Sequence, residues 1–308
     1  MSPAGYRAGC YPPPVLQPIF VGDVQGCADE LETLLGRVEA TFGTAFELWI
    51  VGDVVNRGPD NLRALRRVRE LVAAGRGHYV LGNHELNLLR IAAGLCEPSP
   101  LDTISDLLEA PDADDWIEWL RRRPVAIAGA LGSQRFALVH AAVHPDWGID
   151  EIACRASRVT ERLGAESWCE AREFLAGDPA EDEVLDALLR FTRCRSANGE
   201  GSWAAEAPAL APSGYRAWHE EWSERGHGYG VVYGHWALQG LHVARGLRGL
   251  DTGCVHHGRG RDGVLTAWVP DPNGEEPFAP HDEAFWRVQA RRAYYVHRDS
   301  FESGEISD

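Results

Sequence analysis

Carboxylate, amide and imidazole side chains follow five short apolar segments of this 308-residue sequence. In chain order they are Asp23, Gln25, Asp53, Asn83, His140 and His235. Oxygen and imidazole ligands without a thiolate suit Mn, Co, Fe or Zn, and one carboxylate can bridge two such ions. Taken alone, each motif is also typical of a turn with a helix cap or of a packed histidine. Together, their order and their atom types predict a site for a pair of divalent cations.

The segments that precede these side chains are typical of buried strands. They are PIFVGD, ELWIVGD, HYVLGN, RFALVHA and YGVVYGH. Helical patterns, ADELETLLGRVEA and NLRALRRVRELVAA, lie between the first three. Asp23, Asp53 and Asn83 are 30 residues apart, about the length of one strand–helix–strand step. We therefore expect an α/β fold in which all these groups emerge at the same edge of a parallel sheet.

The patterns outside the strands divide the chain into parts. Residues 1–17 are Pro-rich and predict a flexible extension, whereas residues 18–270 predict one domain. Within this domain we expect a helical cap insertion at about 86–125 and a loop-like stretch at about 197–228. Residues 271–308 are polar and acidic, with a frayed end expected.

The composition restricts the partners and the compartment. Thirty Lys and Arg against 46 Asp and Glu give a net charge of −16, which disfavours non-specific nucleic-acid binding. No apolar run is long enough to span a membrane, and the N-terminus lacks the apolar core of a secretory signal. The seven cysteines are scattered and form no C-x-x-C pair, so we expect them to be free side chains, mostly small buried ones, in a reducing cytoplasm. Nothing in the sequence implies a stable protein partner.

The motifs GDVQG, GDVVNRGPD, GNHE, VHA and YGHW resemble the signature of the phosphoprotein-phosphatase-type metallophosphatases, which have the calcineurin-like fold. The stretches LLEAPDADDWIEWLRRRPVA, FTRCR ahead of NG, and LDTGC followed by LTAW are similar to a narrower branch, the symmetrical diadenosine tetraphosphatases of bacteria. The resemblance covers about residues 19–268. It implies a metallophosphatase sandwich, with central β-sheets flanked by helices and a dimetal site at the strand ends.

The resemblance also implies a ligand set for each ion. The first ion would be held by Asp23, Gln25 and Asp53. The second would be held by Asp53, which bridges the ions, together with Asn83, His140 and His235. Gln25 stands where the wider family has a histidine, and an amide oxygen is a weaker and harder ligand than imidazole. We therefore expect a labile first ion and a preference for added Mn or Co, with Fe, Zn and Mg as other candidates.

Further residues would act on the substrate. By resemblance, Arg57 and either Arg193 or Arg195 would hold phosphate oxygens, and Asn83 would face the substrate as well as its ion. His84 would stand beside the leaving group as an acid or charge stabiliser. Asn56 occupies the position where related protein phosphatases have an Asp that charges this histidine. We expect His84 to be a poorer proton donor without that carboxylate, which favours an anhydride substrate over a phosphoprotein.

Some residues have two open interpretations. Trp147, Trp218 and Trp236 could stack on adenine or pack in the core, and Trp236 is the best suited to stacking because it follows a predicted ligand. His144, His256 and His257 could lie near the site or in solvated loops. Residues 121–123, all Arg, are typical of a solvated helix end, although they could attract a polyphosphate if the cap covers the site.

The expected reaction is symmetrical hydrolysis of diadenosine tetraphosphate to two ADP, with a hydroxide held between the two ions as nucleophile. Three alternatives stay open. The chain could be a protein serine/threonine phosphatase, an enzyme that removes nucleoside-tetraphosphate caps from RNA 5′ ends, or a nucleotide-binding module without catalytic activity. The charge of −16 disfavours extensive RNA contact but allows binding of a 5′ end alone.

Overall fold

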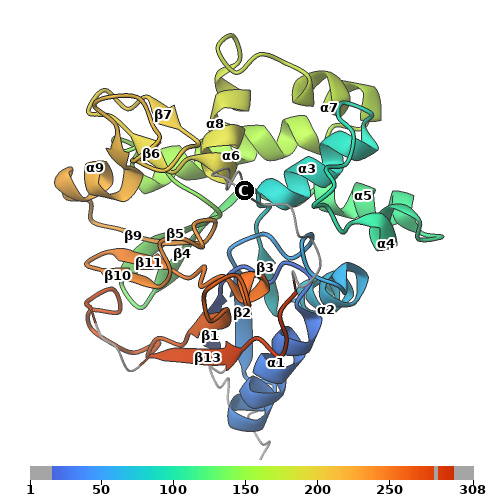
Figure 1. The fold of residues 1–308 in the computed structure, drawn as a ribbon. Coiled ribbons are helices and arrows are strands. Elements are labelled where there is room, and N and C mark those ends of the chain that lie inside the picture. The colour runs from blue at the N-terminus through green and yellow to red at the C-terminus, as the bar shows by residue number, and fades with distance from the viewer. Residues whose placement is uncertain (1–15, 281–283, 295–308) are drawn as a thin grey trace, which may run out of the picture.

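The computed structural model describes residues 16–280 and 284–294. Most of the predicted N-terminal extension and the end of the C-terminal segment lie outside the described residues. Two five-stranded sheets form the centre of the protein (Figure 1). The strands of the first sheet, in spatial order, are β13 (Phe285–Gln289), β12 (Val264–Trp268), β1 (Gln17–Val21), β2 (Phe46–Ile50) and β3 (Gly77–Tyr79).

The second sheet faces the first. Its strands, in spatial order, are β10 (His242–Ala244), β11 (Leu247–Gly249), β9 (Gly230–Tyr233), β5 (Gln134–Val139) and β4 (Ala126–Leu131). A small third sheet contains β7 (Trp203–Ala204), β6 (Ser196–Ala197) and β8 (Arg216–Ala217).

An aromatic core holds the two large sheets together. Phe20 of β1 packs edge-on against Phe136 of β5, with ring centroids 5.2 Å apart, and stacks on Trp268 of β12 at 5.0 Å. These side chains belong to one buried apolar cluster drawn from both sheets. Burial of large aromatic rings is strongly favourable, so the sandwich gives the strand ends a rigid support.

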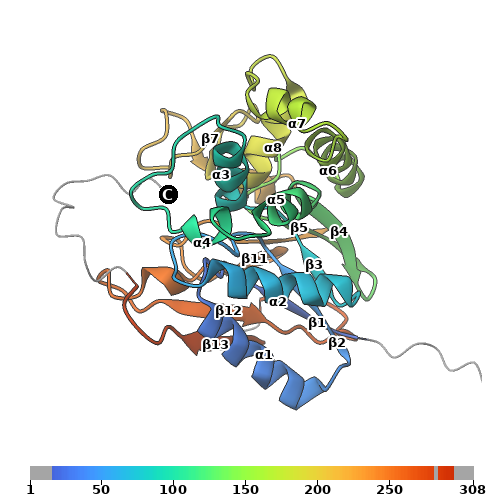
Figure 2. The same ribbon diagram turned by 90° about the vertical axis from the view of Figure 1, so that its right-hand side faces the viewer.

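Helices flank the outer faces of the sandwich and gather beyond its strand ends (Figure 1). They are α1 (Ala28–Phe42), α2 (Asn61–Ala73), α3 (Asn83–Ala92), α4 (Ser105–Leu108), α5 (Ala113–Arg121), α6 (Ile149–Leu163), α7 (Trp168–Leu175), α8 (Glu183–Arg193) and α9 (Trp218–Glu224), with the 3-10 turn η1 (Cys254–His256). Helices α1 and α2 lie together beside the first sheet (Figure 2), and α6 packs on β4 and β5. Among the described residues, no helix has both the length and the apolar character that crossing a membrane requires.

The strand directions correct one prediction. Strands β1, β2 and β3 are parallel, as expected, but His140 and His235 follow β5 and β9, a parallel pair in the second sheet. Both sheets are mixed rather than parallel. In the first, β12 is antiparallel to both of its neighbours, β1 and β13. In the second, β4 is antiparallel to β5 and β10 is antiparallel to β11. The predicted ligands therefore converge from the strand ends of two sheets.

Two segments are more ordered than their sequences predict. Part of the polar C-terminal segment forms β13, an edge strand that pairs with β12. The stretch 197–228, expected to be loop-like, contains β7, β8 and α9.

Candidate metal centre

The predicted ligands come together at the strand ends. Donor atoms of Asp23, Asp53 and His140 lie within 4.8 Å of one another, and all three side chains are buried. The amide oxygen Oδ1 of Asn83 lies 2.9 Å from Nε2 of His140 and 2.8 Å from Nδ1 of His235. Five of the six predicted ligands are thus in mutual contact or nearly so, which is the compactness that a metal centre requires.

Glycines before these ligands make that compactness possible. A Cβ on Gly82 would lie 2.0 Å from Oδ1 of Asp53, and a Cβ on Gly234 would lie 2.0 Å from Oδ1 of Asp23. Any other residue at either position would overlap a ligand atom. The glycine in GN and GH is therefore required by close approach of a carboxylate from a neighbouring strand end.

Backbone strain is concentrated at the same place. Among the described residues, the non-glycine residues with φ in the left-handed region are Gln25, Asp53, Asn56, Arg57 and His235. All five belong to the predicted site or adjoin it. Such conformations cost about 1–3 kcal/mol each and persist only when surrounding contacts hold them.

Glu85 supplies those contacts. Its buried carboxylate accepts hydrogen bonds from the backbone N–H groups of Asp53 and Gly82 at 2.9 and 2.8 Å. It also accepts from Val54 at 2.8 Å and from Val55 at 3.2 Å. One side chain thereby fixes the turn after β2 to the start of α3, which sets the position of Asp53.

Backbone carbonyls orient the two ligand histidines. The Nδ1–H of His140 donates to the carbonyl of Val51 at 2.9 Å, and the Nε2–H of His235 donates to that of Arg193 at 3.1 Å. Each ring then turns its other nitrogen, Nε2 of His140 and Nδ1 of His235, toward Oδ1 of Asn83. When both rings are neutral, three lone-pair acceptors face one another there, an arrangement that a cation would stabilise.

The electrostatics also call for positive charge. Burial raises the pKa of Asp23 well above its ordinary value, and the carboxylates of Asp251 and Asp53 raise it further. Burial alone would raise the pKa of Asp53, but His140 and His84 lower it to about 2. Buried carboxylates that repel one another favour a bound cation.

The side-chain oxygen of Gln25 has no hydrogen-bond partner. This atom, Oε1, is buried, and a buried polar atom without a hydrogen bond is unusual. Together with the converging lone pairs and the repelling carboxylates, this atom fits divalent cations. The donor set contains oxygens and imidazoles and no thiolate.

The predicted phosphate-binding arginines differ in how their N–H groups are used. Nη1 of Arg57 and Nε of Arg193 are buried and have no hydrogen-bond partner. Burial lowers the pKa of Arg193, as does the nearby Arg90, whereas Cys96 and the carboxylate of Asp53 act in the opposite direction. Arg195 instead donates to the carbonyls of Ala205 at 3.0 Å and His235 at 3.4 Å.

A carboxylate that the sequence did not reveal lies behind Asn56. The Nδ2 group of Asn56 lies 3.1 Å from Nδ1 of His84 and donates to Oδ1 of Asp102 at 2.8 Å. Asp102 contacts the amide and not the ring, so the group beside Nδ1 of His84 is still neutral and the expectation of a poorer proton donor stays a prediction. Asp102 belongs to the loop between α3 and α4, where no motif or periodicity marks it.

The residues with two open interpretations lie in different environments. Trp236 is half-buried, whereas Trp147 and Trp218 are buried in the core and do not line the site. His144 stacks on Trp147, with ring centroids 5.2 Å apart. Arg121 is not a solvated helix end: it is 2 % exposed and donates to the carbonyls of Leu163 and Ala165 at 2.8 and 2.6 Å, which joins α5 to the end of α6.

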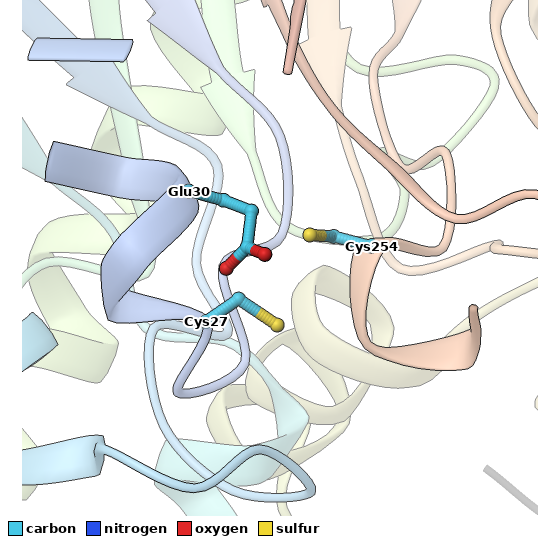
Figure 3. Close-up of side chains that lie close together, drawn as sticks. All are labelled: Cys27, Glu30 and Cys254. Atoms are coloured by element: carbon cyan, nitrogen blue, oxygen red, sulfur yellow. The ribbon is translucent and has the colours of Figure 1, made fainter. Parts of the chain in front are cut away.

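A second group of buried ligand-type side chains lies under the Gln25 turn. Cys27 and Glu30, at the start of α1, face Cys254 of η1 (Figure 3), with donor atoms within 4.8 Å of one another. The hydroxyl of Tyr294 donates to both Glu30 oxygens at 2.7 Å, and burial raises the pKa of the Cys27 thiol. Since the carboxylate is hydrogen-bonded and the thiol stays protonated, we interpret this cluster as a tie between α1 and the C-terminal segment.

The chain matches known proteins over most of its length. Residues 17–239 match the family model described as calcineurin-like phosphoesterase. A protein of Ralstonia nicotianae named bis(5′-nucleosyl)-tetraphosphatase, symmetrical, is 37 % identical over 79 % of this chain and 87 % of its own length. A protein of the same name from Burkholderia thailandensis is 39 % identical over 77 % of this chain and 86 % of its own length.

Two solved structures share the fold. A crystal structure assigned as a diadenosine tetraphosphatase aligns over 91 % of this chain and 96 % of its own, with a TM-score of 0.57 and 24 % identity. A protein serine/threonine phosphatase of Saccharomyces cerevisiae aligns over 93 % and 82 %, with a TM-score of 0.53 and 13 % identity. At these identities the likeness shows the fold alone.

Proposed function

The chain belongs to the symmetrical bis(5′-nucleosyl)-tetraphosphatases within the calcineurin-like phosphoesterases, and we propose that it uses the metal centre to hydrolyse diadenosine tetraphosphate to two ADP. One observation carries the assignment of the site. The amide oxygen of Asn83 and one ring nitrogen each of His140 and His235 converge next to the buried carboxylates of Asp23 and Asp53. Such a set has little structural purpose without cations.

Membership of this family implies divalent metal ions, and the donor atoms suggest how they are held. We assign Asp23, Gln25 and Asp53 to one ion, and Asp53 with Asn83, His140 and His235 to the other. When bound, the ions polarise a phosphoryl oxygen, activate water and neutralise developing charge. Because the amide of Gln25 is a neutral and weak ligand, the ion at the first position would be labile, and added Mn or Co would be preferred there.

The protein's own side chains would bind and orient the tetraphosphate. Arg193 has a buried Nε–H without a hydrogen-bond partner, so it can donate to a phosphate oxygen without first losing a bond. Nη1 of Arg57 makes no hydrogen bond either, but it lies 3.6 Å from the carboxylate of Asp102. We therefore prefer Arg193 over Arg195 as the second phosphate-binding arginine, because Arg195 already donates to two carbonyls. Trp236, half-buried beside His235, is suited to stack on an adenine.

His84 would act on the leaving ADP. Its Nε2 lies 3.7 Å from Oδ2 of Asp53, so this edge of the ring faces the metal centre. An Nε2–H there can donate to the oxygen on which charge develops as the phosphoanhydride bond breaks. A nucleoside diphosphate spreads its own charge, so a hydrogen bond suffices where an alkoxide would need a full proton.

The same cleavage could act on nucleoside-tetraphosphate caps of RNA, since the reacting anhydride is identical. The charge of −16 favours the free dinucleotide over extended RNA contacts. Six free cysteines among the described residues are compatible with a reducing compartment such as the cytoplasm.

Product analysis tests the proposed function. Purified protein is incubated with diadenosine tetraphosphate in the presence of Mn, of Co or of a chelator, with an Asp53→Asn variant as the matched control. We expect ADP alone, only with metal, and no turnover by the variant. Formation of ATP with AMP would refute symmetrical cleavage. Inactivity toward this substrate beside brisk phosphopeptide hydrolysis would assign the chain to the protein phosphatases.

A further inference from the structure

The side-chain amide of Asn56 has a fixed orientation. Its Oδ1 accepts hydrogen bonds from the backbone N–H groups of Arg57 at 2.7 Å and Thr103 at 3.0 Å. Its Nδ2 must therefore point the other way, toward His84 and Asp102. Asn56 is fully buried, so this orientation is set by protein contacts alone.

The fixed amide determines the tautomer of His84. An amide nitrogen only donates, so Nδ1 of His84 accepts the hydrogen bond at 3.1 Å. A neutral imidazole whose Nδ1 accepts must carry its proton on Nε2, the nitrogen that faces Asp53. Asn56 thus presents the Nε2–H donor that the proposed reaction uses.

Asp102 is surrounded by hydrogen-bond donors. Its Oδ1 accepts from Nδ2 of Asn56 at 2.8 Å, and its Oδ2 accepts from Ser99 N at 2.7 Å and from Asn87 Nδ2 at 3.2 Å. Its carboxylate also lies 3.6 Å from Nη1 of Arg57, and the side chain is only 3 % exposed. Four donor groups around one carboxylate hold it in a single orientation.

We propose that Asp102 is a positioning residue, which acts through Asn56 to hold His84 in the Nε2–H tautomer with that nitrogen toward the metal centre. The inference rests on the proposed function for its catalytic consequence, but the tautomer itself is independent of turnover. Through its contact with Nη1 of Arg57, Asp102 also orients that guanidinium. A loop between α3 and α4 thereby controls both a leaving-group donor and a phosphate-binding arginine.

The tautomer can be read by ¹⁵N NMR of the histidine rings in the metal-free protein at about pH 8, where an ordinary imidazole is neutral. A His84→Gln variant assigns the His84 signals. The tested variants are Asn56→Ala and Asp102→Ala. Asp106→Ala is the matched control, because Asp106 follows in the same segment and holds only Asn61 and Leu62, at 2.9 and 3.1 Å.

We expect the Nε2–H pattern in the wild type and in Asp106→Ala, and a mixed pattern in the other two variants. In the metal-loaded enzyme, kcat should fall by about 10- to 100-fold in Asn56→Ala and Asp102→Ala, less than the ~10²–10⁴-fold that full acid–base catalysis contributes. KM should rise more in Asp102→Ala, which removes the carboxylate beside the Arg57 guanidinium. The double variant should have no lower kcat than either single variant.

Two results would overturn the proposal. One is an Asp102→Ala protein that keeps both the Nε2–H pattern and the wild-type kcat. The other is an Asp106→Ala protein that loses kcat as severely, which would mean that any damage to this segment has the same effect. If the wild type shows the tautomer but does not cleave diadenosine tetraphosphate, the proposed function fails and the positioning role of Asp102 remains.

Discussion

Replacing Asn56 by Asp puts the contact between Asn56 and Asp102 to a quantitative test. In the variant a carboxylate oxygen takes the place of Nδ2, which lies 2.8 Å from Oδ1 of Asp102. Two full charges at that distance repel by about 6 kcal/mol at an effective dielectric constant of ~20. A shared proton avoids this repulsion, as in other close carboxylate pairs.

The proton sets the expected loss of stability and its pH dependence. Protonating an Asp of ordinary pKa ~3.9 costs about 4 kcal/mol at pH ~7 and about 1.5 kcal/mol at pH ~5. Because the pair binds its proton more tightly in the folded state, the deficit is largest at high pH and disappears as the pH falls toward ~4. Asn56→Asp should therefore lower the free energy of unfolding by up to about 4 kcal/mol at neutral pH.

Urea unfolding of the metal-free wild type and variant at both pH values measures this difference. The control is the exchange variant Asn56→Asp/Asp102→Asn, in which the amide at 102 donates to the carboxylate at 56 and accepts from Ser99 and Asn87. The exchange should restore most of the stability. An equal loss at both pH values, or no gain from the exchange, would refute this account of the contact.

The exchange variant also tests whether a carboxylate beside His84 improves the histidine as a proton donor. There Nδ1 of His84 would donate to a carboxylate, which favours the imidazolium form. Hydrolysis of a phosphomonoester with a poor leaving group should then improve relative to hydrolysis of diadenosine tetraphosphate. The single change Asn56→Asp, which the sequence alone favours for this test, is unsuitable because it brings two carboxylates together.

Further changes test the other parts of the site. Arg193→Ala should raise KM for diadenosine tetraphosphate by about tenfold, the loss of one charge-assisted bond. Arg195→Ala should instead lower metal retention, because Arg195 donates to the carbonyl of His235; steady-state kinetics and metal analysis after dialysis separate the two. Gln25→His should retain more metal through dialysis, and equal retention would contradict a weak amide ligand. Tyr294→Phe should lower the free energy of unfolding by about 1.5–3 kcal/mol without changing kcat, since the lost hydroxyl binds the Glu30 carboxylate.

Ligands at strand ends are predictable from sequence for a local reason. Asp53 and Asn83 each follow a glycine at the end of a short apolar strand, so their place is fixed by the strand before them. Which strands share a sheet is a different matter. His140 and His235 lie far apart in the chain, and only the pairing of β5 with β9 shows that they belong to a second sheet.

Asp102 and β13 escape prediction for different reasons. Asp102 is placed by contacts with Ser99, Asn87 and Asn56, none of which forms a repeating pattern, so tertiary contacts decide its position. The strand Phe285–Gln289, FWRVQ, carries a local strand signal in its two aromatic residues and its valine. The prediction missed this signal because the strand is short and lies within a segment that is polar on average.

Because the net charge is −16, polyphosphate binding depends on arginine N–H groups that lack a hydrogen-bond partner more than on the number of arginines. An acidic protein that binds a polyphosphate needs positive charge that is local and not already neutralised. Arg121 and Arg248 are buried too, but they donate to backbone carbonyls and thereby serve the fold. Arg193 keeps a buried Nε–H without a hydrogen-bond partner, and Nη1 of Arg57 makes no hydrogen bond beyond its 3.6 Å contact with Asp102. The protein thus concentrates its unused donors and its cation-binding oxygens at one place, and repels polyanions elsewhere.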